Sequence, residues 1–351
     1  MIARVPARRR ALCALVCALA VAVCGTAASA PARGAPPSSG ISALSGLPPG
    51  IAPASGVPVD MAAPYEYLGW GEPQPPVSVM SETGIRDITL AFVLSHGTCN
   101  PEWDGQRPLL GGSDAQAIAA IRAAGGEVVA SFGGWSGSKL GVSCKTPAAL
   151  AAAYQKVVAD YGLQAIDIDI EHTEISGAAV RKRVVAALAM LQREDPALEI
   201  SLTLGVGEGG PEPAGLSLIA DAAAIGFQPT VWTGMPFDFG RPLTDMGHAS
   251  IRAALALAAD LVSRYGISEA QALEHTGISS MNGRTDEASE TVTVADYETM
   301  LAFAREVDLG RMSFWSVNRD RPCPAGDPGA ECSGIAQTPY AFTDLLAGYQ
   351  G

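Results

Sequence analysis

Three acidic residues alternate with isoleucine in one short segment: Asp167, Asp169 and Glu171. Alternate residues of a β-strand face the same way, so the acids would share one face and the isoleucines the other. Carboxylates roughly 6 to 7 Å apart on a buried face repel and desolvate one another, which raises the pKa of at least one. A carboxyl group that holds its proton near neutral pH can act as a general acid. The segment therefore predicts acid-base chemistry.

The order of the acids along the strand ranks their roles. Glu171 is the last of the three, and active sites of parallel barrels lie at the carboxyl ends of strands. We therefore expect Glu171 to be the general acid and Asp167 to lie deeper. Ordinary solvated acids at a strand end, and a Mg²⁺ or Ca²⁺ site, are the alternatives. The strict alternation argues against the first, and the lack of supporting acids or histidines at other strand ends against the second. We expect neither metal nor cofactor.

The rest of the chain supplies elements that could position these acids. Short apolar segments alternate with Ala- and Leu-rich segments of helical spacing, and strand followed by helix, repeated eight times, predicts a single (β/α)₈ TIM barrel of the α/β class. Gly277 interrupts the seventh segment, so seven strands remain an alternative. The eight segments are YEYLGW, RDITLAFVL, EVVASF, LQAIDIDIE, EISLTLGV, TVWTGMPF, EHTGISSM and RMSFWSV.

The amino-terminal part reads as an export signal followed by a linker. Residues 1–30 combine a basic run, an apolar run and an Ala-Ser-Ala end, which predicts a signal peptide cut after Ala30. A lipid anchor at Cys24 is the alternative, but Val23 stands where a small residue should precede it. Residues 31–60 are rich in Pro, Gly, Ala and Ser and predict a flexible linker. Residues 61–351 would form the catalytic barrel of a secreted, extracellular protein.

Cysteines and charge restrict the environment and the partners. Four cysteines follow the signal peptide and permit three pairings. Because Cys99 and Cys144 each follow a predicted strand, and Cys323 and Cys332 lie close together in one loop, we expect Cys99 to pair with Cys144 and Cys323 with Cys332. The formal charge is −13, and loss of residues 1–30, with four arginines and no acid, would leave −17. Such a charge excludes nucleic acid and anionic membrane as expected partners. We expect a monomer that has no membrane contact after signal cleavage.

The acid series resembles a motif of glycoside hydrolase family 18, D-G-x-D-x-D-x-E. The last three acids match, while Gln164 and Ala165 replace the leading pair, as in a bacterial and archaeal branch of chitinases. The family's S-x-G-G motif is present as Ser131-Phe-Gly-Gly, and the segments MSFWSVNRDRPC and SGIAQTPYAF resemble the end of that branch. The resemblance covers about residues 64 to 346. Ser131, Gly133 and Gly134 of this motif would serve shape and not catalysis.

The resemblance implies a mechanism with roles for all three acids. Glu171 would protonate the glycosidic oxygen while the 2-acetamido oxygen of the substrate attacks the anomeric carbon, with net retention. Asp169 would hold the acetamide N–H and balance the cation. Asp167 would share a proton with Asp169 and let it turn toward Glu171.

The resemblance also implies substrate-binding residues. Met235 and Asp238 match the branch's M-x-M-D-Y motif, in which Phe237 and Phe239 bring no hydroxyl group. Weak or altered activity is therefore one expectation. Trp315 matches the tryptophan that floors the cleaved-sugar site, and a tryptophan face suits the C–H face of a pyranose.

Other aromatic residues near predicted strand ends could either pack in the core or bind sugar. These are Trp70, Trp135 and Trp232, of which we assign Trp70 to the substrate site. His172 stands where the branch has glycine, and alternation would place its side chain on the outer face. We interpret it as a surface or loop histidine.

The sequence as a whole predicts a chitinase acting on chitin or chito-oligosaccharides. Two alternatives remain open. An endo-β-N-acetylglucosaminidase acting on N-glycans needs the same acids and differs in groove shape. A non-catalytic, lectin-like chitin-binding protein would typically lack the acid or its partner, yet Glu171 and Asp169 are both present.

Overall fold

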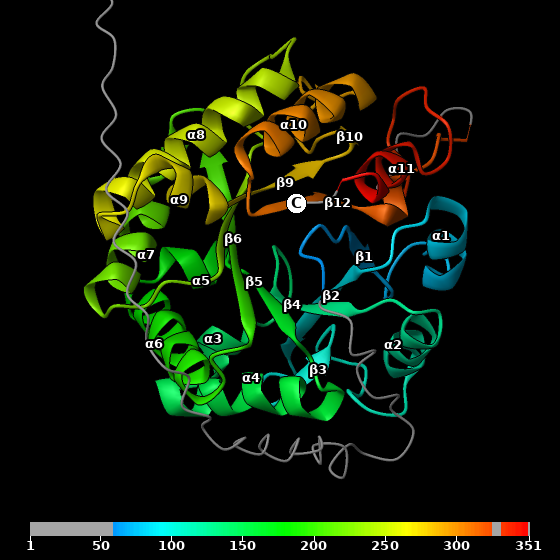
Figure 1. The fold of residues 1–351 in the computed structure, drawn as a ribbon. Coiled ribbons are helices and arrows are strands. Elements are labelled where there is room, and N and C mark those ends of the chain that lie inside the picture. The colour runs from blue at the N-terminus through cyan, green and yellow to red at the C-terminus, as the bar shows by residue number, and fades with distance from the viewer. Residues whose placement is uncertain (1–58, 325–330, 350–351) are drawn as a thin grey trace, which may run out of the picture. The chain divides into compact units, whose positions relative to one another are not determined.

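A closed barrel of eight parallel strands forms the centre of the computed structural model, which describes residues 59–324 and 331–349. The strand order is β1-β12-β9-β8-β6-β5-β4-β2, and pairing of β1 with β2 closes it (Figure 1). The strands are β1 (Tyr65–Tyr67), β2 (Ile88–Ser95), β4 (Val128–Gly133), β5 (Ala165–Asp169), β6 (Glu199–Gly207), β8 (Val231–Met235), β9 (Thr276–Met281) and β12 (Arg311–Trp315). All eight predicted strands are present, and the predicted TIM barrel is confirmed.

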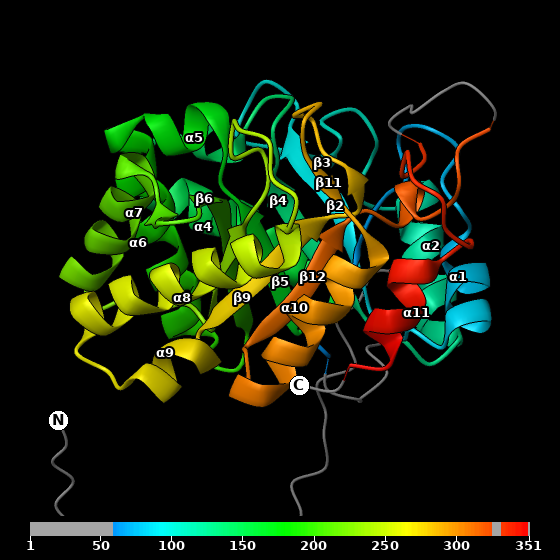
Figure 2. The same cartoon turned by 90° about the horizontal axis from the view of Figure 1, so that it is seen from above.

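Helices surround this barrel, and short extra strands extend its rim (Figure 2). The helices are α1 (Pro76–Thr83), α2 (Ser113–Ala123), α3 (Leu140–Ser143), α4 (Pro147–Tyr161), α5 (His172–Ser176), α6 (Ala178–Glu194), α7 (Pro213–Ala224), α8 (Met246–Tyr265), α9 (Glu269–Glu274), α10 (Val294–Val307), α11 (Ala341–Ala347) and the 3₁₀ turn η1 (Val317–Arg319). The extra strands are β3 (Pro101–Trp103), β7 (Gly210–Pro211), β10 (Gly283–Arg284) and β11 (Thr291–Val292). No helix within 59–324 or 331–349 is long and apolar enough to cross a membrane.

The seventh strand, β9, tolerates Gly277 because close packing requires it. A Cβ atom at Gly277 would stand 2.8 Å from both the Cβ of Arg311 and the Oγ1 of Thr233. The glycine that weakened the prediction of this strand thus leaves room for side chains of the barrel interior.

Both faces of β5 follow the predicted alternation. Ile166, Ile168 and Ile170 are fully buried in the hydrophobic core between sheet and helices. Asp167 and Asp169 lie on the opposite face, inside the barrel, and are buried as well. Burial of isoleucine on one face therefore directs the acids of β5 inward.

The described residues begin two positions before the predicted start of the barrel domain. Val59, Met61 and Ala63 form a small apolar cluster with Val129 and Ala165, at the starts of β4 and β5. Val59, near the end of the predicted linker, thus packs against the barrel. The predicted signal peptide, the alternative anchor Cys24 and the remainder of the predicted linker lie outside the described residues.

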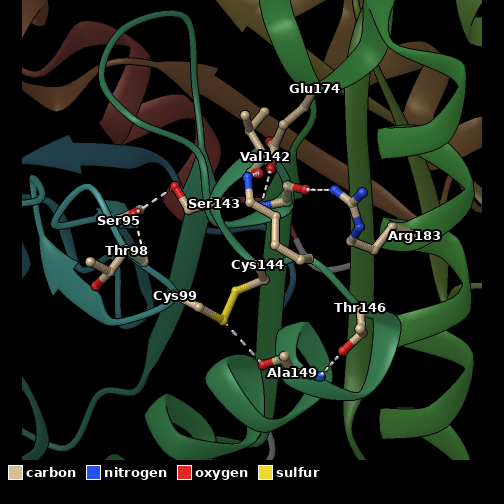
Figure 3. The surroundings of a disulfide bond; sticks show 12 residues. Ser95, Thr98, Cys99, Val142, Ser143, Cys144, Thr146, Ala149, Glu174 and Arg183 are labelled. Carbon is tan, nitrogen blue, oxygen red and sulfur yellow. Dashed lines mark hydrogen bonds between the residues drawn. A yellow bond between two sulfur atoms is a disulfide. The ribbon is translucent and has the colours of Figure 1, made fainter.

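Both predicted disulfides are formed. Cys99 pairs with Cys144, joining the β2–β3 connection to the segment between α3 and α4 (Figure 3). Beside this bond, the Ser95 hydroxyl donates to the Ser143 hydroxyl at 2.8 Å. The second disulfide joins Cys323 to Cys332.

The two disulfides are expected to stabilise the fold unequally. Cys99 and Cys144 are 45 residues apart in sequence, while Cys323 and Cys332 are 9 apart. Loop-closure entropy then predicts that replacing the first pair by alanine lowers the free energy of unfolding by about 4 kcal/mol, against about 3 kcal/mol for the second. Urea denaturation of the two double variants measures this difference. A larger loss for the Cys323/Cys332 variant would contradict the prediction.

Candidate active site

A cleft of about 1030 Å³ opens at the carboxyl ends of the barrel strands. Its lining is acidic and aromatic, and lacks any lysine or arginine. The acids are Asp104, Asp169, Glu171, Glu212, Asp238 and Asp286, and the aromatic residues are Tyr65, Tyr67, Trp70, Phe92, Trp135, His172, Phe237, Phe239 and Trp315. This end of the barrel is the one where TIM-barrel enzymes carry their active sites.

All five residues predicted to bind substrate line this cleft: Trp70, Met235, Phe237, Asp238 and Trp315. Trp70 keeps 43% of its surface exposed, whereas Met235 is buried at the end of β8. Asp238 adopts a left-handed conformation with φ of 55°. These positions come from three segments far apart in sequence that the barrel closure brings together.

Asp167 lies beneath the cleft and is fully buried. One of its carboxylate oxygens accepts hydrogen bonds from the hydroxyls of Tyr65 at 2.8 Å and Ser131 at 2.6 Å. The other accepts from Thr203 Oγ1 and from the guanidinium of Arg311, both at 2.6 Å. Asp167 therefore faces four donors, one of them a permanent cation.

Asp169 stands above it, at the end of β5, and is 4% exposed. Burial raises the pKa of Asp169 well above its usual value, and the nearby charges of Glu171 and Asp167 raise it further. The positive charges of Lys139 and Arg311 act in the opposite direction. Such a carboxyl group tends to keep a proton in the absence of substrate.

Glu171 lies immediately before α5, in an extended conformation that continues the strand. Burial raises the pKa of Glu171 to about 7, while Lys139 and a hydrogen bond with Asp169 limit the rise. The charges of Asp238 and Asp286 raise it further. A hydrogen bond between two carboxyl groups requires one proton, so Glu171 and Asp169 act as a pair that shares it. This is the protonation expected of a general acid near neutral pH.

The buried Lys139 is a charge near these acids that the sequence analysis missed. It is 2% exposed, and its ammonium group donates to the backbone carbonyls of Gly133, at 3.1 Å, Gly134 and Ser136. Burial lowers the pKa of Lys139, and three nearby carboxylates act against this effect. No motif or spacing in the sequence marks this lysine.

Two glycines allow the loop after β4 to approach β5 closely. Gly133 and Gly134 have φ values of 104° and 79°, a region that side chains rarely adopt. A Cβ atom on Gly133 would stand 2.1 Å from the carbonyl oxygen of Asp169. The backbone N–H of Gly134 donates to that same oxygen at 2.9 Å. The two glycines thus have the predicted role in shape, whereas Ser131 of the same motif also donates a hydrogen bond to Asp167.

An aromatic floor adjoins the acids. Trp315, at the end of β12, stacks on Phe92 with ring centroids 5.4 Å apart and planes 12° apart. The ring centroids of Tyr65 and Tyr67, both in β1, lie 6.0 and 6.4 Å from the ring centroid of Trp315. Rigid aromatic faces of this kind suit the apolar face of a sugar ring.

Trp135 and Trp232 differ completely in environment. Trp135 is 66% exposed at the cleft, whereas Trp232 is fully buried. Trp232 therefore serves packing, which sequence alone left undecided.

His172 is not on the outer face, where strand alternation would have placed it. It lines the cleft, and its ring meets that of Trp135 edge-on at 5.1 Å between centroids. The expectation failed because α5 starts at His172 and the strand geometry stops before it. His172 has φ of 45°, a left-handed value that favours glycine.

The described part of the chain contains no group of three or more His, Cys, Asp or Glu side chains arranged to hold a metal ion. The three acids of the series are instead partnered by a buried arginine, by hydroxyl groups and by each other.

Comparison with known proteins identifies relatives of one kind. No family model matches the chain. It is 27% identical over 314 residues to a probable bifunctional chitinase/lysozyme of Escherichia coli, covering 84% of this chain and 35% of that protein. It is 28% identical over 255 residues to endochitinase 11 of Metarhizium anisopliae, covering 68% and 48%. The chain thus spans about a third to a half of the length of these curated relatives.

Solved structures show the same similarity at the level of the whole barrel. The catalytic domain of a hyperthermophilic chitinase from Pyrococcus furiosus matches with a TM-score of 0.74 and 28% identity, covering 84% of this chain and 98% of that domain. Catalytic-site mutants of active domain 2 of a thermostable chitinase from the same organism, complexed with chito-oligosaccharides, match with a TM-score of 0.75 and 27% identity, covering 86% and 97%.

Proposed function

The chain belongs to the chitinases of glycoside hydrolase family 18, and on this premise we propose that it hydrolyses β-1,4 bonds between N-acetylglucosamine units of chitin or chito-oligosaccharides. The observation that carries the proposal is the position of Glu171. This carboxyl group has a pKa raised to about 7 and stands beside Asp169 in a cleft with aromatic walls.

We assign the first chemical step to Glu171. Its proton passes to the glycosidic oxygen as the bond to the leaving sugar breaks. The acetamido oxygen of the substrate attacks the anomeric carbon and closes an oxazolinium ring, which carries the positive charge. Asp169, which no longer shares a proton with Glu171, accepts a hydrogen bond from the acetamide N–H. Its negative charge balances the positive charge of the ring.

The second step reverses the role of Glu171. Its carboxylate removes a proton from a water molecule that attacks the anomeric carbon and opens the ring. Two displacements at one carbon leave its configuration unchanged, so the product retains the β-anomer. This route requires an N-acetyl group beside the broken bond.

We also propose that the protein acts outside the cell. The support is the signal-like composition of residues 1–30 together with two disulfides, which persist in oxidising environments. A free thiol content of zero in protein purified from the culture medium, with an amino terminus at Pro31, would establish export.

The direct test is cleavage of defined oligosaccharides by the purified protein. Chito-oligosaccharides should be cleaved, and cello-oligosaccharides, which lack the acetamido group, should not. Mass spectrometry identifies the fragments, and NMR of the fresh product distinguishes the retained β-anomer from the inverted one. Cleavage of cello-oligosaccharides would rule out the substrate-assisted route. Cleavage of N-glycans without cleavage of chito-oligosaccharides would assign the protein to the other substrate.

The pKa of Glu171 predicts how activity depends on pH. The general acid must be protonated in the free enzyme, and its pKa is raised to about 7. Therefore kcat/KM should fall as pH rises through about 7. The charge of Asp286 contributes to this raised pKa, so Asp286→Asn should move the decline to lower pH. A decline that stays in place, or moves upward, would contradict the assignment.

Glu174 provides the control for this profile. It is buried, its pKa is also raised to about 7 by burial, and it does not line the cleft. Glu174→Gln should leave the position of the decline unchanged. A shift in this variant would show that Glu174, and not Glu171, limits activity at higher pH.

A further inference from the structure

The ion pair between Arg311 and Asp167 is buried in the interior of the barrel. Both side chains are 0% exposed, and the guanidinium nitrogen lies 2.6 Å from the carboxylate oxygen. Arg311 is the first residue of β12, so it enters the barrel from the end opposite the cleft. Its partner lies 144 residues away in sequence, two positions before Asp169.

Hydroxyl groups from other strands surround the guanidinium and fix its position. Arg311 donates to Ser201 at 2.7 Å, to Thr203 at 3.2 Å and, through its other terminal nitrogen, to Thr89 at 3.4 Å. It also lies over the ring of Tyr65, 5.3 Å from the centroid. Apart from Asp167 itself, the charged or titratable groups that act on this cluster are Tyr65 and Asp169.

The two aspartates of β5 differ sharply in how well their oxygens are satisfied. Asp167 has four donors on two oxygens. Asp169 has one buried oxygen, Oδ1, without a hydrogen-bond partner among residues 59–324 and 331–349. A carboxylate saturated by donors has no lone pair directed at another carboxyl group, so a shared proton has no place on Asp167.

Resting on the proposed glycosidase function, we propose that Arg311 is a positioning residue that holds Asp167 as a permanent anion, so that the mobile proton of the site passes only between Asp169 and Glu171. The family resemblance implied the opposite arrangement, with a proton shared between Asp167 and Asp169. In this chain the guanidinium takes the place of that proton.

Charge neutrality supports this division. An arginine does not lose its proton in a protein interior, so Arg311 offsets the negative charge of Asp167. The buried ammonium of Lys139 compensates the remaining negative charge of the Asp169–Glu171 pair. Arg311 thus forms its ion pair with Asp167, and Lys139 lies near the Asp169–Glu171 pair, to which we assign the exchange of protons.

A double-mutant cycle tests the proposal through activity. Arg311→Met leaves Asp167 without its cation, so that Asp167 takes up a proton, and Asp167→Asn leaves an uncompensated buried cation; each should lower kcat/KM by about 100-fold. The combined variant replaces the ion pair by neutral groups of similar shape and should recover to within about tenfold of the parent. Arg311→Lys, which keeps the charge, should retain the parent's pH profile.

The pH profile of the combined variant separates a proton-holding role from a purely structural one. If the proton stays between Asp169 and Glu171, the decline of kcat/KM as pH rises through about 7 persists in the combined variant. If Asp167 receives a proton during the reaction, the combined variant stays as inactive as Asp167→Asn, and the proposal is overturned.

Infrared spectroscopy gives an answer that does not depend on activity or on the proposed substrate. With ¹³C-labelled aspartate, Arg311→Met should show one more protonated aspartate carboxyl group than the parent at neutral pH, because Asp167 then takes a proton. The combined variant should not show this signal. Equal numbers in parent and Arg311→Met would overturn the proposal even in a protein that cleaves no chitin. Circular dichroism of each variant confirms that folded protein is compared.

Discussion

Glu171→Gln should lower kcat on chito-oligosaccharides by about 1000-fold or more, because glutamine cannot donate a proton to the leaving sugar. The substitution keeps the size and shape of the side chain in a site where Glu171 contacts Asp169. We therefore expect KM to change little. Single-turnover and steady-state assays of parent and variant measure the two parameters separately.

The expected loss of activity in Glu171→Gln should not come from loss of folding, because the substitution should not lower the free energy of unfolding. The pKa of Glu171 is raised from 4.5 to about 7 in the folded chain, so the folded state favours the protonated carboxyl group. The stability that this protonated group contributes is fully present below pH 4.5 and is lost as pH rises through about 7. Glutamine does not ionise, so the variant should be at least as stable as the parent above pH 7. Thermal unfolding at that pH checks this.

Glu174→Gln is the matched control, because the same substitution is made three residues further along, on a buried glutamate with a similar pKa. The carboxylate of Glu174 accepts from the backbone of Gly141 at 2.8 Å and lies outside the cleft. We expect kcat to fall by less than about threefold. Comparable losses in both variants would mean that the defect at Glu171 is structural.

Asp169→Asn should lower kcat by about 100-fold to 1000-fold, because the amide carries no charge to balance the oxazolinium ion. The amide oxygen can still accept a hydrogen bond from the acetamide N–H. Substrate binding should therefore be largely retained, and the loss should fall on kcat rather than KM. Kinetics with a chromogenic chitobioside provide the measurement.

Asp286→Asn is the corresponding control for removing one negative charge from the cleft. Asp286 lines the cleft, and its negative charge raises the pKa of Glu171, but its side chain is exposed to solvent. Its replacement should change kcat by less than about threefold at the optimum, since exposed charges are screened by water. A main effect of Asp169→Asn on KM would assign that residue to binding in the ground state.

Local patterns in the sequence were sufficient for the strands and for the placement of the acids. Strand alternation has a period of two, so burying Ile166, Ile168 and Ile170 necessarily turns Asp167 and Asp169 to the opposite face. The pairing of Cys99 with Cys144 followed from their positions after two neighbouring strands. The inference from strand alternation succeeds because it depends on backbone geometry over a few residues. The disulfide inference succeeds because the two cysteines follow strands that pair with each other.

Only the tertiary structure decided which charges surround those acids. Arg311 reaches Asp167 across the closed barrel, and Lys139 is held near Glu171 by the carbonyls of its own loop. His172 faces the cleft because a helix begins where the strand pattern would have continued. The sequence by itself thus determined the barrel and the acid face, which local periodicity controls. Barrel closure determined the proton environment, because it alone brings residues more than a hundred positions apart within hydrogen-bonding distance.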